Sequence, residues 1–323
     1  MQITSIQSDS RYRVGGLLYT PASDKKIAQR IISHEYQYLT STALCLEDSI
    51  SDEGLPLAEK QLKDTLNQLK TARCELPMVF VRVRSPEHLK HIHSYLRDEE
   101  SVLTGYIFPK FDLSNCSSYC EQIRAYNEHR IQTLYMMPIL ESRAVADIGN
   151  RVDILWEIKR NLDGIKQYVL NIRVGGNDLS NMYGLRRSET QTIYDIGVIR
   201  DILVNIINVF ASDYIVSGPV WEYFGSDSLA PWSTGLMREI ELDLLNGFFG
   251  KTAIHPLQLP IIFNSLKVTR RDYEDSLQIL DWQDHDLGVA KGTNGDRMNE
   301  VKCHSKWAER IVARAAAYGI RDE

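Results

Sequence analysis

Short apolar runs recur along the chain, and segments in which apolar residues have helical spacing separate them. Strands that alternate with helices in this way are typical of a parallel sheet that the helices cover. The predicted strands are residues 15–20, 42–46, 78–83, 104–109, 133–140, 168–174, 214–220 and 251–254. Eight such units predict an α/β fold, a single (β/α)8 TIM barrel, rather than a β-sandwich or a helical bundle.

The chain has 323 residues, whereas a single barrel of this kind commonly has about 250. We therefore predict three parts: an N-terminal peripheral segment (1–14), a TIM-barrel catalytic domain (15–266) and a helical C-terminal extension (267–323). A glycine-rich loop at 284–296 interrupts the helical pattern of this extension. The extension is expected to cover the site or to reach a neighbouring subunit.

Composition and charge exclude several classes of protein. With 43% hydrophobic and 25% charged residues, the chain has the composition of a soluble globular protein. Its net charge of -6 argues against nucleic-acid binding, and no run approaches the roughly 20 apolar residues of a membrane span. The five cysteines are scattered, without the spacing of a zinc site or a disulfide framework. A reducing cytoplasm is the expected location.

Residues 171–180 (NIRVGGNDLS) combine an apolar run with a sudden change to polar residues. The run ends at Gly175 and Gly176, and glycines allow a sharp turn or a close approach to a ligand. Asn177 and Asp178 follow, and a carboxylate just past a strand end is well placed to bind a hard cation. Taken alone, the stretch fits a turn in which Asp178 caps the next helix better than it fits a site. Similar polar residues after the other strands favour the site.

In a TIM barrel the active site lies at the C-terminal ends of the strands. Each polar residue there also has a structural interpretation. Glu47 or Asp48 could cap the following helix, Lys110 could pair with a carboxylate, and His255 before Pro256 could be a hydrogen-bonding strut. The polar residues at the predicted strand ends are Glu47, Asp48, Arg82, Lys110, Asp112, Glu141, Asn177, Asp178, Ser217 and His255.

Glu141 and Asp178 are the predicted metal ligands. Two carboxylates from adjacent strands, completed by waters and substrate oxygens, suit Mg²⁺, with Mn²⁺ as the alternative. Arg82 is the natural partner of a carboxylate or of a developing enolate, because its guanidinium stays charged and binds planar oxyanions. Together these residues could chelate a 2-oxo acid while a carbon–carbon bond breaks or forms.

Seven motifs in chain order resemble the citrate lyase β-subunit-like proteins of the HpcH/HpaI aldolase superfamily, which include malyl-CoA lyases. The match spans roughly residues 15–260, and its last motif is specific. The motifs are Pro21, Leu46-Glu47-Asp48, Val81-Arg82-Val83, Pro109-Lys110, Leu140-Glu141, Gly175-Gly176-Asn177-Asp178-Leu179 and Gly250-Lys251-Thr252-Ala253-Ile254-His255-Pro256.

The resemblance implies a Mg²⁺-dependent carbon–carbon lyase that acts next to a 2-oxo acid or an acyl-CoA thioester. It implies Glu141 and Asp178 on the metal and Arg82 against the substrate. It also implies a homo-oligomer, a trimer or a multiple of trimers. Further catalytic candidates are Glu47, Asp48, Lys110 and Glu300, and candidates for binding substrate or CoA are Lys25, Lys26, Arg30, Asn177 and His255.

Three positions depart from the pattern of this family. Glu300 stands at the place of the family's catalytic Asp, Ala22 replaces a common Gly, and Cys45 replaces an acid. These features most resemble a divergent branch of lyase-like barrels associated with tellurium-resistance and stress-response gene clusters. Two alternatives remain open: a class II aldolase of free 2-oxo acids that does not use CoA, and a non-catalytic metal-binding barrel in a stress-response complex.

Overall fold

The computed structural model describes residues 9–282 and 288–322. By contacts, the chain forms two compact units, Val14–Ile262 on the one hand and Met1–Arg13 with Phe263–Glu323 on the other. Residues 1–8 of the predicted N-terminal segment and residues 284–287 of the predicted glycine-rich loop lie outside the described residues.

The larger unit contains an eight-stranded parallel sheet in the order β7-β6-β5-β4-β3-β2-β1-β8. A bridge between Gly218 and Lys251 joins the two ends of this order, so the sheet closes into the predicted TIM barrel. The strands are β1 (Gly16–Pro21), β2 (Ser41–Cys45), β3 (Met78–Arg82), β4 (Gly105–Phe108), β5 (Tyr135–Leu140), β6 (Ile172–Val174), β7 (Val216–Ser217) and β8 (Lys251–Ala253).

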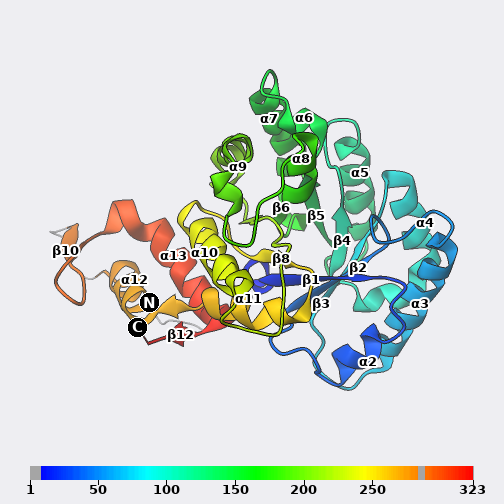
Figure 1. Ribbon diagram of the computed structural model, residues 1–323, viewed down its shortest axis with the longest axis horizontal. Helices are drawn as coiled ribbons and strands as arrows, with labels where there is room; N and C mark the ends of the chain where they lie inside the picture. Colours follow the sequence, from blue (N-terminus) through cyan, green and yellow to red (C-terminus); the bar gives the residue numbers. More distant parts are fainter. Residues whose placement is uncertain (1–8, 283–287, 323) are drawn as a thin grey trace. The chain divides into compact units, whose positions relative to one another are not determined.

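Helices lie around the outside of these strands (Figure 1). Local sequence explains several of their starts: Ser85 accepts a hydrogen bond from the amide of His88 at the start of α4, and Pro56 and Pro231 occupy the first turns of α3 and α10. The helices are α2 (Ile27–Ile32), α3 (Leu55–Thr71), α4 (Pro86–Leu96), α5 (Cys116–Asn127), α6 (Arg143–Ala146), α7 (Arg151–Asp163), α8 (Gly176–Met182), α9 (Gly197–Phe210), α10 (Pro231–Leu245) and α11 (Leu259–Ser265).

Two strands have less than half of their predicted length, whereas the others differ from prediction by one or two residues. Of the predicted strand 168–174 only β6 forms, because Lys166–Tyr168 is a 3-10 turn and Val169 contributes an isolated bridge. Of the predicted strand 214–220 only β7 forms. Pro219 follows it and has no amide hydrogen to donate to a neighbouring strand.

The barrel has an inner and an outer apolar layer. Successive strand residues point to opposite faces, so one set fills the interior and the other packs under the helices. The inner set includes Leu17, Ala43, Phe80, Ile107, Met137, Ile139 and Leu170. The outer set joins alternate strand residues, such as Leu44, Val81 and Tyr106, to the buried faces of the helices. Inward-facing residues at the C-terminal ends of the strands, beyond this apolar layer, are therefore available to form a site.

A buried cluster of charges joins β8 to α10, and we call it the Lys251 cluster. The Nζ atom of Lys251 donates to Glu239 and to Asp243, at 2.7 Å each. Tyr194 donates to Asp243 at 2.7 Å, and Arg187 donates to Glu239 at 3.2 Å. Lys251 and Glu239 are fully buried. Such a cluster is stable only while its charges balance, so it fixes the end of the barrel at β8.

The smaller unit combines helices with short strands. Its helices are α1 (Ser10–Arg13), α12 (Arg270–Leu280) and α13 (Val301–Tyr318). β10 (Val289–Lys291) and β11 (Met298–Glu300) are antiparallel, whereas β9 (Val268–Thr269) and β12 (Ile320–Arg321) are parallel. The C-terminal residues are therefore mostly helical, with two small sheets that the sequence pattern did not indicate. Within the described ranges, every helix is too short or too polar to cross a bilayer.

Asp275 gives the smaller unit a predictable acid sensitivity. Burial alone would raise the pKa of this carboxyl, but hydrogen bonds from Thr293 and Arg297 lower it to about 2. The pKa of an unfolded Asp is about 3.9. The ionised carboxylate therefore stabilises the fold above about pH 4, and this contribution is lost as the pH falls from about 4 towards 2.

We expect Asp275→Asn to lower the urea midpoint of unfolding at pH 6 and to have a smaller effect at pH 2.5. Both proteins are to be unfolded in urea at each pH. A difference between them that stayed the same at the two pH values would contradict this role of Asp275.

Candidate active site

A cavity of about 200 Å³ lies at the C-terminal ends of the barrel strands. Arg82 is the last residue of β3, and Glu141 directly follows β5. Asp178 lies in the first turn of α8, just after β6. The charged and amide side chains that line the cavity are Asp48, Arg82, Glu141, Arg173, Asn177 and Asp178. The two predicted metal ligands and the predicted substrate arginine thus face one cavity.

Glu141 is a buried carboxylate at the centre of this site, with 3% of its surface exposed. Its Oε1 atom accepts a hydrogen bond from the backbone amide of Lys110 at 2.9 Å, and Arg82 Nη2 lies 3.4 Å from it. Burial raises the pKa of Glu141 to about 8, and the charge of Asp178 adds to the rise, although Arg82 opposes it. A cation bound next to Glu141 would therefore stabilise the ionised form of its carboxylate.

The backbone of Lys110 makes this arrangement possible. Lys110 has a φ of 49°, in the left-handed region that residues other than glycine rarely adopt. In this conformation its amide donates to Glu141 while its side chain reaches Glu47, with Nζ 2.8 Å from Oε1. One residue thus joins the ends of β2, β4 and β5. Backbone strain of this kind is common at functional sites.

Arg82 is held by carboxylates on several sides. Its Nη2 atom lies 2.7 Å from Glu47, 3.2 Å from Asp48 and 3.4 Å from Glu141. Burial opposes its charge, but its neighbours, Tyr19 and Glu141 foremost, raise its pKa overall. The guanidinium is therefore always charged and held in one orientation beside the cavity.

Glu47 and Asp48 do not cap a helix. The next helix, α3, begins at Leu55, and its N-cap is Gly54. Burial raises the pKa of Glu47, whereas the hydrogen bond with Glu47 and the charge of Arg82 lower the pKa of Asp48 against the effect of its own burial. The capping interpretation is therefore wrong for both residues, and their partners are Arg82 and Lys110. The predicted pairing of Lys110 with a carboxylate is confirmed by its contact with Glu47.

The capping interpretation of Asp178 is also wrong. The N-cap of α8 is Gly175, and no side chain caps this helix. Asn177 and Asp178 instead line the same cavity as Arg82. The two glycines allow a close approach of the backbone to its neighbours, as predicted. A Cβ on Gly175 would lie 1.9 Å from Glu141 Oε2, and one on Gly176 would lie 2.7 Å from Pro219.

The donor set of the cavity fits Mg²⁺. Mg²⁺ binds oxygen ligands and usually takes one or two carboxylates, with waters and substrate completing its shell. Glu141 and Asp178 supply two carboxylates whose charges repel each other, and a cation between them would relieve that repulsion. Across the described residues, no group of three or more His, Cys, Asp and Glu side chains could hold a metal ion. The site therefore suits a cation shared with substrate and water, not one enclosed by protein.

The close contact between Gly175 and Glu141 leads to a prediction on stability. Gly175→Ala should lower the free energy of unfolding by about 1–3 kcal/mol, because the new Cβ would overlap the carboxylate of Glu141. In a Glu141→Gly background the same substitution should have little effect, because Oε2, Cβ and Cδ of Glu141, at 1.9, 2.5 and 2.8 Å from the new Cβ, are then all gone. Urea unfolding of the four proteins measures both values.

Gly197→Ala is the matched control for this experiment, because nothing lies within 4 Å of a Cβ at that position. It should leave stability unchanged or slightly higher. An equal loss from Gly175→Ala in both backgrounds would show that Glu141 is not the neighbour that matters.

Three polar residues of the cavity were missed by sequence reasoning: Tyr19, Arg173 and Thr252. Arg173 lies inside the apolar run of β6, and its Nη2 atom donates to Thr252 Oγ1 at 2.6 Å. Tyr19, on β1, lies below the guanidinium of Arg82, whose Cζ is 5.8 Å from the ring centroid. The spacing of the strand could have identified Arg173. Asn171, Arg173 and Gly175 occupy alternate positions of one strand segment, so their side chains share a face.

Several predicted residues lie outside the lining of the cavity. His255 accepts a hydrogen bond from the amide of Leu257 and stacks on Phe224, with ring centroids 4.2 Å apart. Lys25 and Lys26 are exposed, and Arg30 pairs with Asp24 at 2.9 Å. Asp112 accepts a hydrogen bond from the amide of Ser114 in a turn, and Ser217 is buried. Binding of substrate or CoA by His255, Lys25, Lys26 and Arg30 stays a prediction.

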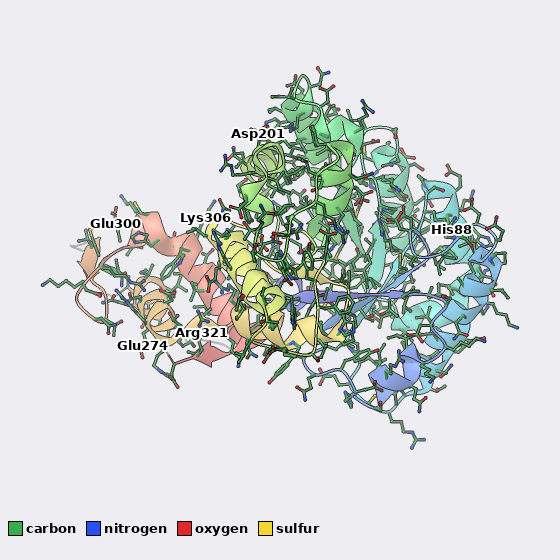
Figure 2. All side chains as sticks on the ribbon, viewed as in Figure 1. His88, Asp201, Glu274, Glu300, Lys306 and Arg321 are labelled. Carbon is green, nitrogen blue, oxygen red and sulfur yellow. The ribbon has the colours of Figure 1, made fainter. Side chains whose placement is uncertain are left out.

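Glu300 belongs to the smaller unit. It ends β11 and directly precedes α13, and its label in Figure 2 stands beside the red helix of this unit. Its amide donates to His304 Nδ1 at 3.0 Å, and its carboxylate raises the pKa of the Cys303 thiol. A catalytic role for Glu300 stays a prediction.

Comparisons with known proteins agree with the barrel. The model of a family described as C-C bond lyase of the TIM-barrel fold matches residues 8–320. No curated protein matches the chain in sequence. Among solved structures, the chain is similar to the protein CitE from Mycobacterium tuberculosis in complex with magnesium, acetoacetate and coenzyme A, with 17% identity, a TM-score of 0.59 and coverage of 94% of this chain and 99% of that one.

Two further structures are similar. A citrate lyase from Burkholderia xenovorans LB400 has 13% identity and a TM-score of 0.66, with coverage of 96% of this chain and 93% of that one. A malate synthase from Haloferax volcanii has 11% identity and a TM-score of 0.57, with coverage of 77% and 73%. At these identities the likeness establishes a common fold.

Proposed function

Because the chain belongs to the C-C bond lyase family of the TIM-barrel fold, we propose that it cleaves or forms a carbon–carbon bond next to the carbonyl group of a small 2-oxo acid, with Mg²⁺ as cofactor. One observation carries the proposal. Arg82, Glu141 and Asp178 are distant in the sequence and yet line one cavity of about 200 Å³. A guanidinium beside two carboxylates suits an oxo acid that is bound together with a divalent cation.

Glu141 and Asp178 are the residues that would hold the cation. When bound, Mg²⁺ would supply Lewis-acid polarisation of the oxygens of the oxo acid. Mn²⁺ accepts the same oxygen ligands and is the expected substitute. The magnesium in the similar structure of the M. tuberculosis protein supports this choice of cofactor.

Arg82 would stabilise the negative charge that develops on the substrate oxygen as the bond breaks. Its contacts with Glu47 and Asp48 hold the guanidinium in place before the reaction, so little reorganisation is needed. Lys110 in turn fixes Glu47 at 2.8 Å. We therefore assign Glu47, Asp48 and Lys110 to the positioning of Arg82.

Proton transfer is the proposed role of Glu300, because a carboxylate can act as a general acid or base. Asn177 lines the cavity beside Asp178 and would donate a hydrogen bond to the substrate. Once a turnover assay exists, Glu300→Gln tests the first role. Unchanged turnover in this variant would remove Glu300 from the mechanism.

The size of the cavity favours a compact acid as the group that reacts. A cavity of about 200 Å³ is below the range of about 300–1,000 Å³ that is typical of drug-sized ligands. The CoA moiety of a thioester would therefore extend out of the cavity. Lys25, Lys26 and Arg30 remain the candidates for its phosphates. The similar structure with bound coenzyme A keeps the thioester open as a substrate.

Product formation tests the proposal. The protein with Mg²⁺ is incubated with glyoxylate, pyruvate or oxaloacetate, with and without acetyl-CoA, and the products are identified by mass spectrometry. We expect a condensation or cleavage product that disappears with EDTA and in Glu141→Gln. Equal turnover with and without acetyl-CoA would rule out the thioester and leave an aldolase of free acids. Mg²⁺ binding without any product would contradict the lyase and favour a metal-binding barrel.

The Glu at position 300, where the related family has an Asp, is the observation that favours such a non-catalytic barrel. We also propose that the protein acts in a stress-response complex associated with tellurium resistance. Its proposed assembly is a trimer, and its proposed location is the cytoplasm. Size-exclusion chromatography with light scattering tests the assembly. A monomer at all concentrations would contradict the trimer.

A further inference from the structure

Arg173 is a buried cation that faces the cavity of the proposed lyase. It lies on β6, with 1% of its surface exposed, and it lines the cavity together with Glu141 and Asp178. Its Nη2 atom donates to Thr252 Oγ1 at 2.6 Å. The hydroxyl of Tyr19 is its other polar neighbour, and burial raises the pKa of that hydroxyl, so it stays neutral. Neither neighbour offsets the charge of the guanidinium.

The charge of Arg173 has no counterion among the residues that the structure describes. Its Nε and Nη1 atoms are buried and have no hydrogen-bond partner. Arg82, in the same cavity, lies within 3.4 Å of Glu47, Asp48 and Glu141. The charge of Arg82 is thus balanced by nearby carboxylates, whereas that of Arg173 is not. A buried charge without a partner is unfavourable, so an anion at Arg173 would be stabilising.

The register of the strands places Arg173 deeper in the barrel than the proposed metal ligands. Arg173 pairs with Ile139 of β5, and Glu141 lies two residues further along that strand on the same face. Two strand residues span about 6–7 Å. The floor of the cavity therefore carries a free cation, and its rim carries the two carboxylates.

We propose that Arg173 binds a second carboxylate of the substrate, at the end opposite the Glu141 and Asp178 cation site, so that the protein selects dianionic over monoanionic 2-oxo acids. The inference rests on the proposed function for the identity of the first anionic end. An arginine suits this task because its planar fork of donors matches a carboxylate and its charge does not depend on pH near neutrality. Thr252 would orient the guanidinium.

Binding, not turnover, tests this inference. Calorimetry measures the affinity of the Mg²⁺-loaded protein for oxaloacetate and for pyruvate, which differ by one carboxylate, and malate and lactate serve as a chemically stable second pair. We expect wild type to bind the dianion about 10- to 100-fold more tightly than the monoanion, the range of one charge-assisted contact. Arg173→Met should abolish this preference and leave the affinity for pyruvate unchanged.

Two further variants separate recognition from folding. Arg173→Lys keeps the charge without the fork and should retain part of the preference. Thr252→Val removes the acceptor of Arg173 and should weaken the dianion more than the monoanion. Arg173→Met should fold with an unchanged or higher urea midpoint, because it removes a buried charge that has no counterion.

The inference is overturned if wild type binds the two acids of a pair equally, or if Arg173→Met weakens both acids by the same factor. Mg²⁺ titration without any acid separates this failure from failure of the proposed function. Mg²⁺ bound with no preference for the dianion contradicts only the role of Arg173. If Mg²⁺ does not bind, the proposed function fails, and the acid pairs titrated without metal still decide whether Arg173 selects dianions.

Discussion

Glu141→Gln and Asp178→Asn are each expected to weaken Mg²⁺ binding by at least about 100-fold. Partners that only orient a metal ligand are worth about 10- to 100-fold, and these two carboxylates would contact the ion. Each substitution keeps the shape of the side chain and removes its charge. Calorimetry with Mg²⁺, repeated with Mn²⁺, measures the affinity.

The stability of these variants distinguishes loss of a ligand from loss of the fold. Burial disfavours the charged form of Glu141, so Glu141→Gln should not lower the urea midpoint. Asp48→Asn is the matched control, because Asp48 lines the same cavity but pairs with Arg82. It should change Mg²⁺ affinity much less. Equal affinities in wild type and in the Glu141→Gln, Asp178→Asn double variant would exclude this pair as the metal site.

Lys251→Met is expected to lower the free energy of unfolding by about 3–5 kcal/mol, because removal of one partner leaves buried charges uncompensated. The substitution would leave Glu239 and Asp243 buried without the ammonium that now bonds both at 2.7 Å. Burial already raises the pKa of Asp243 to about 6 even with Lys251 present. Without Lys251 that pKa should rise further, so the loss should be larger at pH 8 than at pH 5.

Lys166→Met is the matched control for this prediction. Lys166 pairs with Asp213 at 3.0 Å, but both side chains are partly exposed, and such pairs contribute about 0–1 kcal/mol. Urea and thermal unfolding of the two variants at pH 5 and pH 8 provide the comparison. Similar losses in both, or a loss for Lys251→Met that did not change with pH, would contradict the account of the Lys251 cluster.

The barrel could be predicted from sequence because strands that are buried on both faces form continuous apolar runs. The convergence of Glu141 and Asp178 on one cavity could be predicted for a similar reason, since the C-terminal ends of parallel strands meet at one rim. The lengths of β6 and β7 could not. They depend on hydrogen-bond partners in neighbouring strands and on the missing amide hydrogen of Pro219.

Residues whose roles arise from tertiary contacts escaped prediction. Arg173 looked like a polar interruption of an apolar run, and only the register with Ile139 places it at the floor of the cavity. The left-handed backbone of Lys110 has no signature in a sequence without glycine at that position. Lys251 stood in a recognised motif, but its partners Glu239 and Asp243 lie one turn apart on α10, a spacing that many helices share.

The central claim is that Glu141 and Asp178 bind one divalent cation in the cavity that Arg82 and Arg173 also line. A crystal structure of the protein grown with Mn²⁺ and a small dicarboxylate tests it most directly, because anomalous scattering locates the metal independently of the chemical model. We predict one metal peak in contact with both carboxylates and the acid extending from it towards Arg173. A metal peak at any other place, with the Glu141 and Asp178 carboxylates free of it, would contradict the claim.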